Sequence, residues 1–357
     1  MAKVTLQTIA DQVGVSRMTV SNAFSRPDQL SASLRERILE TARELGYVGP
    51  DPSARALARG STGAVGVLLT DALQYAFADE VAMAFLGAIA SELAPTGLAL
   101  TLLTSSETSG RVPARDVAMD GALVYSCDPT TPAVEWLRKR GLPLVFVDQV
   151  QAPGVPSVNV DDRGGARAAA QHLVNLGHRR IGIVSAAVGG SFGLDPDPLA
   201  SPLAHPVRQR LLGWLEALRA AGIEPPVVKV PDSGHDDYLA GARLLLALPE
   251  RPTAILCFSD VVAAAVVHAA EDAGLRVPED LSVVGFDDSP MAARMRPALT
   301  TVRQDFAAKG KVAAAELTGA LAAPRSEVRR RARHHVLPTE LVVRASTAPP
   351  RRDQEGS

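Results

Sequence analysis

Residues 17–22 carry polar side chains at a spacing that suits contact with DNA. Within and just after this stretch, Val20, Ala23 and Phe24 recur at helical intervals and form one apolar face, which leaves the other residues pointing outward. The outward residues are Arg17, Met18, Thr19, Ser21 and Asn22. Arginine, serine, threonine and asparagine form hydrogen bonds with base edges and phosphates in a major groove. The stretch is therefore predicted to be a helix whose exposed face reads sequence.

The neighbouring residues predict two further short helices that would hold this helix in place. An apolar stripe over residues 6–13 ends at Gly14, because glycine enters a left-handed turn without steric cost. Ser16 then stands where a helix N-cap is needed, and a third helix capped by Ser31 or Ser33 follows. The three helices predict a helix-turn-helix head, with an ordinary pair of packed helices as the alternative.

Three motifs extend this pattern: Val4-Thr-Leu-x-x-Ile-Ala-x-x-x-Gly-Val-Ser-x-x-Thr-Val-Ser, Leu45-Gly-Tyr47 and Ala54-Arg-Ala-Leu57-Ala-Arg. Together they resemble the LacI/GalR family of bacterial transcription regulators. The resemblance implies a homodimer that binds palindromic operator DNA, because one head reads only half of a two-fold site. The further candidate DNA-binding residues are Thr5, Ser16, Ser31, Arg55 and Leu57.

Residues 50–61 are predicted to be a linker that contains one short helix. Pro52 stands near the helix start and Gly60 ends it, and a helix of this length is marginal in water alone. The resemblance implies that the matching segment folds when two copies lie side by side over the minor groove. There, a leucine that matches Leu57 wedges between base steps and kinks the DNA. A plain flexible linker is the alternative.

Charge and cysteine content narrow the class of protein. Residues 1–60 hold eight Lys and Arg against six Asp and Glu, whereas the remainder holds 29 against 33, so the positive balance lies on the predicted head. Cys127 and Cys257 are isolated from one another, which indicates buried, reduced thiols and a cytoplasmic protein. No stretch suggests an export signal or a membrane span, and no cofactor is expected.

From Ala64 onward, apolar runs of strand length alternate with helix-length stretches. The expected strands are 64–70, 98–103, 121–125, 142–147, 157–160, 180–185, 227–230, 253–258 and 281–286, with a final strand after His334-His335. The expected helices are 80–93, 132–140, 163–176, 208–221, 237–248 and 261–273. Continuous apolar strands between amphipathic helices indicate parallel sheets covered on both faces. The predicted fold class is α plus α/β, with a three-helix head, a hinge helix and a two-lobed core that resembles periplasmic binding proteins.

The expected domain boundaries follow from these patterns and from the resemblance. They are a head at 1–49, a hinge at 50–61, a core at 62–345 and a disordered tail at 346–357. Within the core, the resemblance places lobe one at about 62–160 and 290–322 and lobe two at about 161–289 and 323–343. The tail has two prolines and no leucine, so it lacks the leucine-heptad helix that makes some relatives tetrameric, and a dimer is expected.

A small, sugar-like effector is expected between the lobes, beyond the carboxyl ends of the strands. Carboxylates and amides bind pairs of sugar hydroxyls, and an apolar wall completes such a site. The candidate residues are Asp71, Leu73, Phe77, Asp148, Asn159, Arg210, Ser259 and Asp287. The resemblance implies that Arg210 and Asp287 grip the effector. At Ser259 the chain departs from the asparagine that sugar-responsive relatives often have.

Aspartates at the ends of strands more often cap helices or bind backbone N–H groups than bind a ligand. This structural alternative applies to Asp148, Asp161, Asp260 and Asp288.

The segment 186–206 is longer than the matching loop of the family and rich in Gly, Pro and Asp, which predicts either a lid or a surface loop. Within it, Gly189-Gly-Ser-Phe-Gly193 matches a hydrolase nucleophile pattern, but Ser191 neither follows a strand directly nor precedes a helix. A hydrolase with a Ser191 nucleophile is thus disfavoured. An exported sugar-binding protein is also disfavoured, because it would not explain the head. The seven histidines show no metal-binding spacing.

Overall fold

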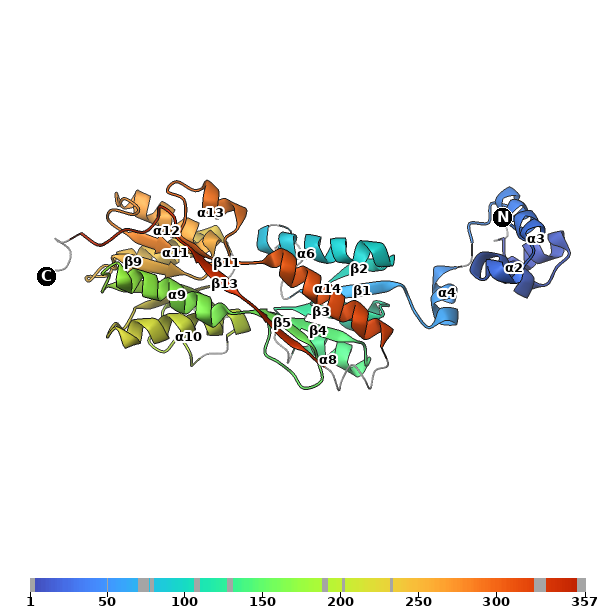
Figure 1. The fold of residues 1–357 in the computed structure, drawn as a ribbon, viewed down its shortest axis with the longest axis horizontal. Coiled ribbons are helices and arrows are strands. Elements are labelled where there is room, and N and C mark those ends of the chain that lie inside the picture. Colours follow the sequence, from blue (N-terminus) through green and yellow to red (C-terminus); the bar gives the residue numbers. More distant parts are fainter. Residues whose placement is uncertain are drawn as a thin grey trace. The chain divides into compact units, whose positions relative to one another are not determined.

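The computed structural model describes residues 4–49, 51–69, 77, 80–105, 110–126, 131–187, 192–200, 203–231, 234–323 and 332–351. Contacts within the chain divide it into two compact units, Met1–Gly63 and Ala64–Ser357. The first unit is helical, and the second is built from sheets with helices on both faces (Figure 1). The predicted fold class is confirmed.

Three helices form the head: α1 (Leu6–Val13), α2 (Arg17–Ser25) and α3 (Ala32–Glu44), with a 3-10 turn, η1 (Pro27–Gln29), after α2. The buried residues that they share are Ile9, Ala10, Val20, Ala23, Ile38 and Ala42. Gly14 adopts a left-handed conformation with φ 74°, so α1 ends where the sequence predicted. Ser31, not Ser33, caps α3.

The helix α4 (Pro52–Arg59) spans the residues predicted for the hinge helix, and Gly60 follows it with φ 69°. The carboxylate of Asp51 accepts a hydrogen bond from the Ala54 N–H at 3.2 Å. None of its described side chains is buried, and Leu57 is 86% exposed. The helix is therefore held by its own backbone and its cap, which leaves it marginal.

The first lobe is built on a parallel six-stranded sheet in the order β12-β5-β4-β3-β1-β2. Its strands are β1 (Ala64–Leu69), β2 (Ala99–Thr104), β3 (Gly121–Tyr125), β4 (Leu144–Val147), β5 (Ser157–Val160) and β12 (His334–Leu337). Its helical segments are α6 (Glu80–Leu93), η2 (Ala94–Thr96), α7 (Pro113–Asp116), α8 (Pro132–Lys139) and α14 (Phe306–Ala322). One hydrophobic cluster joins the sheet to α6 and α14, and another joins it to α7 and α8. A side chain at Gly310 would collide with Ala88, so glycine permits the close approach of α14 to α6.

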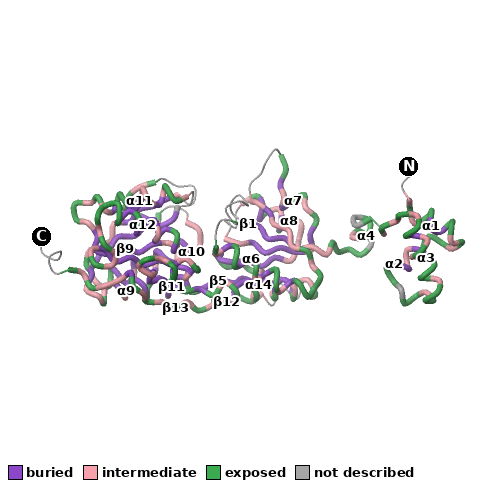
Figure 2. Tube along the Cα trace, turned by 90° about the horizontal axis from the view of Figure 1, so that it is seen from above, coloured by how far each residue is buried: buried purple, intermediate pink, exposed green. Residues whose placement is uncertain are grey.

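The second lobe is built on a five-stranded sheet in the order β10-β9-β6-β8-β7. Its strands are β6 (Ile181–Ala187), β7 (Gly193–Leu194), β8 (Val227–Pro231), β9 (Ala254–Cys257) and β10 (Ser282–Val284). Its helices are α9 (Asp162–Asn175), α10 (His205–Ala220), α11 (His235–Leu246), α12 (Asp260–Asp272) and α13 (Pro290–Arg294). The strands β8, β9 and β10 are buried along nearly all of their length, as Figure 2 shows for β9.

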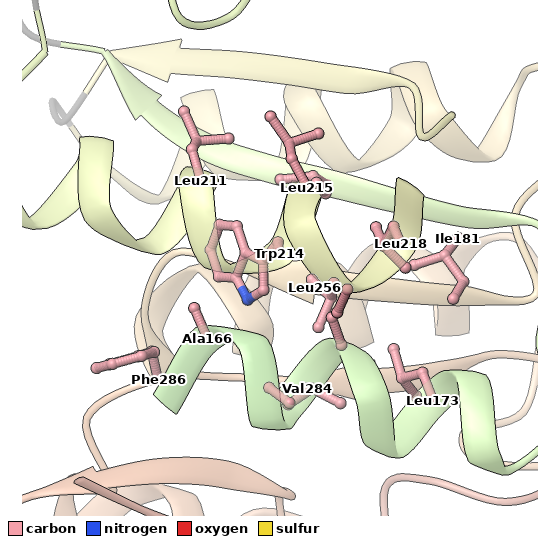
Figure 3. Packing of buried hydrophobic residues seen from close by; sticks show 14 of the residues in the cluster. Ala166, Leu173, Ile181, Leu211, Trp214, Leu215, Leu218, Leu256, Val284 and Phe286 are labelled. Atoms are coloured by element: carbon pink, nitrogen blue, oxygen red, sulfur yellow. The ribbon is translucent and has the colours of Figure 1, made fainter. Parts of the chain in front are cut away.

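The apolar core between α9, α10 and the second sheet surrounds Trp214, which is 1% exposed (Figure 3). A side chain at Gly213 would lie only 2.2 Å from the carbonyl oxygen of Arg163, so glycine at this position lets α10 pack directly on α9. This packing fixes Arg210, one turn before Trp214, against the first turn of α9.

The predicted lobe boundaries need correction near the C-terminal end. Residues 323–343 were assigned to lobe two, but β12 pairs in parallel with β5 and completes the first sheet. Residues 290–322 were assigned to lobe one, but Ala292 and Leu299 pack in the second lobe, and β11 (Thr301–Gln304) pairs with β13 (Thr339–Val342). The pair β11–β13 packs against α9, so it belongs with the second lobe.

The prediction of a disordered tail is wrong for residues 346–351, here termed the C-terminal segment. Ser346 is fully buried: its hydroxyl donates to the Val283 carbonyl at 2.6 Å and accepts from the Thr300 N–H at 2.8 Å. The Ala348 N–H donates to the hydroxyl of Ser282, and Arg351 pairs with Asp280 at 2.8 Å. Residues 352–357 lie outside the described part.

The described part of the 186–206 segment adds strand β7 to the edge of the second sheet, antiparallel to β8. Lys229, whose side chain is only 4% exposed, pairs with Asp195 at 2.6 Å and holds this strand in place. The hydrogen bond from Lys229 is the chief cause that lowers the pKa of Asp195. Residues 192–200 therefore form a surface loop attached to a sheet edge.

Candidate functional site

The candidate residues Thr5, Ser16 and Ser31 are the N-caps of α1, α2 and α3. Their hydroxyls accept hydrogen bonds from the third N–H group of each helix, at 3.3, 3.0 and 3.4 Å respectively. In α1, Thr5 and Thr8 form a reciprocal capping box. These three hydroxyls therefore define where the helices of the head begin.

The outward face of α2 has the composition that the sequence predicted. Arg17 is exposed, Met18 is 69% exposed, and Thr19, Ser21 and Asn22 are partly exposed. The amide of Asn22 donates to the Gln29 Oε1 atom at 3.1 Å, which orients the Asn22 side chain. Sequence reasoning missed Gln29, because it lies in η1 beyond the helical pattern.

The candidate hinge residues Arg55 and Leu57 are both exposed on α4. A leucine that is 86% exposed makes almost no contribution to its own fold, so its apolar surface is available to another molecule.

In the core unit, a chain of buried polar contacts connects the two lobes. Lys309, in α14 of the first lobe, is 1% exposed, and its ammonium group donates to Asp148 at 2.6 Å and to Gln304 at 2.7 Å. The Gln304 amide, at the end of β11, donates to Asp287 at 2.7 Å. Asp148 follows β4 and Asp287 follows β10, so the contacts lie near the carboxyl ends of strands from both sheets.

Arg210 continues this chain within the second lobe. Its Nε atom donates to Asp162 at 2.8 Å, its Nη1 atom donates to the Phe258 carbonyl at 2.6 Å, and its Nη2 atom lies 3.3 Å from Asp287. The rings of Phe258 and Phe286 lie 4.6 and 3.6 Å from the guanidinium carbon. The guanidinium group is thus held on its edges and its faces.

Burial opposes the charged forms of these groups. It raises the pKa of Asp162, an effect that the charge of Asp148 increases and Arg210 opposes. Burial also acts to lower the pKa of Arg210, but the carboxylates of Asp287 and Asp162 outweigh it and raise that pKa. The charges are mutually dependent, so removing one partner leaves another buried and uncompensated.

The structure therefore brings together Asp148, Arg210 and Asp287 of the predicted effector residues. Three residues that the sequence analysis did not select, Asp162, Gln304 and Lys309, join them. Asp162 stands directly after the helix cap Asp161, and Lys309 lies in an alanine-rich helix that was absent from the expected helices. A charged residue at an otherwise apolar helix position was the available signal for Lys309.

The other predicted effector residues have different surroundings. Asn159 is buried and bonds both the N–H and the carbonyl of Gln149 at 3.1 and 2.9 Å, and Ser259 caps α12. Phe77 is 57% exposed. Asp71 and Leu73 lie outside the described residues. Asn159 and Ser259 thus have local structural roles.

Two of the four aspartates at strand ends cap a helix or bind a backbone N–H group, as the structural alternative predicted. Asp161 caps α9, and Asp260 accepts the Ser289 N–H at 2.7 Å and the Thr301 hydroxyl at 2.5 Å. Burial raises the pKa of Asp260 to about 6, although these hydrogen bonds oppose it. The other two aspartates form ion pairs instead: Asp288 pairs with two arginine side chains, and Asp148 pairs with Lys309.

Ser191 and Cys127 lie outside the described residues. Cys257 is buried and not disulfide-bonded. Within the described ranges, no three His, Cys, Asp or Glu side chains are grouped to hold a metal ion. The helices of the same ranges include none with the length and apolar character needed to cross a membrane.

Comparison with known proteins matches both units. Residues 5–50 match the model for bacterial regulatory proteins of the lacI family, and residues 170–347 match a periplasmic binding protein-like domain. An HTH-type transcriptional regulator of Mycolicibacterium smegmatis is 39% identical over 327 residues, which cover 87% of this chain and 88% of that protein.

Two solved structures extend the similarity over nearly the whole chain. The complex of the transcriptional regulator CelR with cellobiose is 28% identical with a TM-score of 0.69, covering 96% of this chain and 100% of that one. The lac repressor dimer bound to operator and the anti-inducer ONPF is 25% identical with a TM-score of 0.78, covering 97% and 100%. The resemblance seen in the sequence is therefore confirmed, and the chain belongs to the LacI family of bacterial transcription regulators.

Proposed function

We propose that the protein is a cytoplasmic repressor that binds a palindromic operator as a dimer and responds to a sugar-like effector bound between its lobes. The main support for DNA binding is the outward face of α2, because it presents Arg17, Met18 and Asn22 from a helix whose opposite face is buried. The exposed Leu57 of α4 supports a second contact in the minor groove.

The chain of contacts from Asp148 to Arg210 supports the proposed effector site. It lies near the carboxyl ends of strands in both sheets, where ligands of α/β proteins commonly bind. An effector that binds one arrangement of the lobes more tightly than another shifts operator affinity by that difference. The solved complex of the related CelR with cellobiose agrees with a sugar-like compound.

Selection of bound duplexes from a random DNA pool, at a fixed moderate salt concentration, tests the operator part of this proposal. Enrichment of a palindrome with a flexible pyrimidine–purine step at its centre is expected, because a two-fold dimer reads two half-sites and bends the DNA between them. Binding that depends on salt but enriches no sequence, with and without candidate sugars, would contradict it.

Arg17→Ala sharpens this test. The variant is expected to lose preference at one position of each half-site, at a cost of about 1–3 kcal/mol, rather than to weaken binding to all sequences evenly. Arg43→Ala is the control, since Arg43 is an exposed arginine on α3 that pairs with Glu40. A uniform loss of affinity with unchanged sequence preference would show that Arg17 does not recognise a base.

A further inference from the structure

Two exposed histidines lie close together where α11 and α12 pack side by side in the second lobe. His235 is the first residue of α11, and His268 lies one turn before the end of α12. The two helices share one apolar cluster, and the ion pair of Arg243 with Asp272 joins the same two helices at 3.0 Å. Side chains of both helices therefore meet at the surface along this seam.

The imidazole rings of His235 and His268 contact each other edge to face. Their centroids are 5.5 Å apart, and their planes cross at 73°. Among the described residues, neither ring has a hydrogen bond or an ion pair, unlike His178 and His335, whose ring nitrogens are bonded. The ring nitrogens, which are the ligating atoms of histidine, are therefore available to a ligand from solvent.

The spacing of these rings is close to the spacing that one metal ion imposes on two imidazole ligands. With Zn–N distances of about 2.1 Å and tetrahedral geometry, two ring centroids lie roughly 5.2 Å apart. The observed separation is 5.5 Å. Because both side chains are exposed, each ring can turn about its Cβ–Cγ bond and bring one nitrogen towards a shared point. The two packed helices thus hold both rings at a distance that suits chelation.

We propose that His235 and His268 bind one transition-metal ion, such as Zn²⁺, Ni²⁺ or Cu²⁺, which joins α11 to α12 while water completes its coordination. Imidazole suits these ions, whereas Mg²⁺ and Ca²⁺ prefer oxygen ligands. Asp272, one turn beyond His268, is paired with Arg243, so the described residues supply two ligands. The site shares no residue with the chain of buried contacts between the lobes, and it does not depend on the effector proposed above.

Calorimetric titration of the untagged full chain with ZnCl2, NiCl2 and CuCl2 tests this site. The titrations are made at about pH 7.5, where imidazole in general is mainly neutral and able to ligate. Two ligands supply roughly half of the binding free energy of a four-ligand zinc site, so a dissociation constant between about 1 and 200 µM is expected for Zn²⁺. Cu²⁺ should bind more tightly than Zn²⁺, and MgCl2 should not bind here.

His235→Asn and His268→Asn test the residues themselves. Each removes one imidazole and keeps a polar side chain, so metal affinity should fall by at least about tenfold. The double variant should bind no more than about twofold more weakly than either single variant, because one remaining imidazole no longer forms a chelate. His334→Asn is the matched control, since His334 is an exposed histidine of the first lobe, and this variant should bind metal like the unmodified chain.

Absence of binding by all three transition-metal ions up to about 1 mM would overturn the proposal. So would an unchanged affinity in either single variant, or losses that simply add in the double variant, because independent histidines do not share an ion. Thermal unfolding without metal checks that each variant is folded, and little change is expected because both side chains are exposed. Operator selection without added metal is a separate measurement, so failure here leaves the proposed function standing.

Discussion

The helix α4 and the C-terminal segment are two short stretches whose order has opposite origins. In α4, every residue from Pro52 to Arg59 is helical, yet no described side chain is buried. The C-terminal segment has no regular secondary structure, yet Ser346 is fully buried and hydrogen-bonded on both sides. Local propensity alone supports the first, whereas contacts with residues about 46–66 positions away hold the second.

Local sequence is therefore a weak guide to which of the two segments is more firmly ordered. A helix of this length is marginal in water, so a partner surface can stabilise it. A proline-containing segment can be fixed as firmly as a core strand if its polar groups complete buried hydrogen bonds. Three measurements test whether α4 and the C-terminal segment are ordered in these different ways.

The largest effect is expected from acid, through His178, which contacts the C-terminal segment. The buried imidazole bonds Thr253 at 2.8 Å and the Ala348 carbonyl at 2.9 Å, and burial lowers its pKa to about 4 from 6.5. Since the unfolded chain takes up this proton first, stability is fully present above pH 6.5 and falls as the pH drops towards 4. About 3 kcal/mol should be lost across that window.

The measurement compares chemical unfolding of the unmodified chain and of His178→Gln at several pH values. Asp260, whose pKa is raised to about 6, contributes with the opposite sign, but its contribution is common to both proteins and cancels in the difference. The variant should lose less stability between pH 6.5 and 4. Parallel curves for the two proteins would show that His178 does not titrate in this way.

The next effect is expected from Ser346→Ala. Removing the hydroxyl leaves the Thr300 N–H and the Val283 carbonyl buried without it, which should cost about 2 kcal/mol of unfolding free energy. Ser91→Ala is the control, since its exposed hydroxyl bonds only the Gly87 carbonyl of its own helix, and a change within about 0.5 kcal/mol is expected. If the two variants were equally stable, the C-terminal segment would not be fixed as described.

The smallest effect on stability is expected from Leu57→Ala in α4. Leu57 is so exposed that the unfolding free energy should change by no more than about 0.5 kcal/mol. Operator affinity should fall by at least about tenfold if this leucine wedges between base steps. Val48→Ala, which removes a fully exposed apolar side chain from the same unit, should change neither quantity. A loss of stability in Leu57→Ala would show that α4 is held by a contact of that side chain.

Sequence reasoning was most successful where function depends on local pattern. The head could be predicted because its helices are short, capped and amphipathic, so Gly14 and Ser16 mark their boundaries directly. Arg210 and Asp287 came from the family resemblance, and the structure places them 3.3 Å apart. Their surroundings could not be predicted, because Lys309 is 161 positions from Asp148 and no local pattern pairs them.

The errors share a physical cause, which is that long-range pairing decides where an isolated strand belongs. The strands β11, β12 and β13 are each four residues long. The strand β12 pairs with β5 of the first lobe, whereas β11 and β13 pair with each other beside the second lobe. The helix α14 was not among the expected helices because its pattern is apolar on nearly all sides, as suits a helix buried against α6. The composition of the C-terminal segment predicts disorder, but its buried Ser346 shows that the segment is ordered by contacts with the core.

The position of β12 in the first sheet has a consequence for biosynthesis. Because β12 supplies the edge next to β5, the first lobe cannot complete its sheet until residue 337 has left the ribosome, although its other strands end at residue 160. The head has all of its core residues once Tyr47 has emerged. During translation, the head can thus fold long before the first sheet of the core is complete, so nascent chains pass through a stage in which a folded head is attached to an incomplete core.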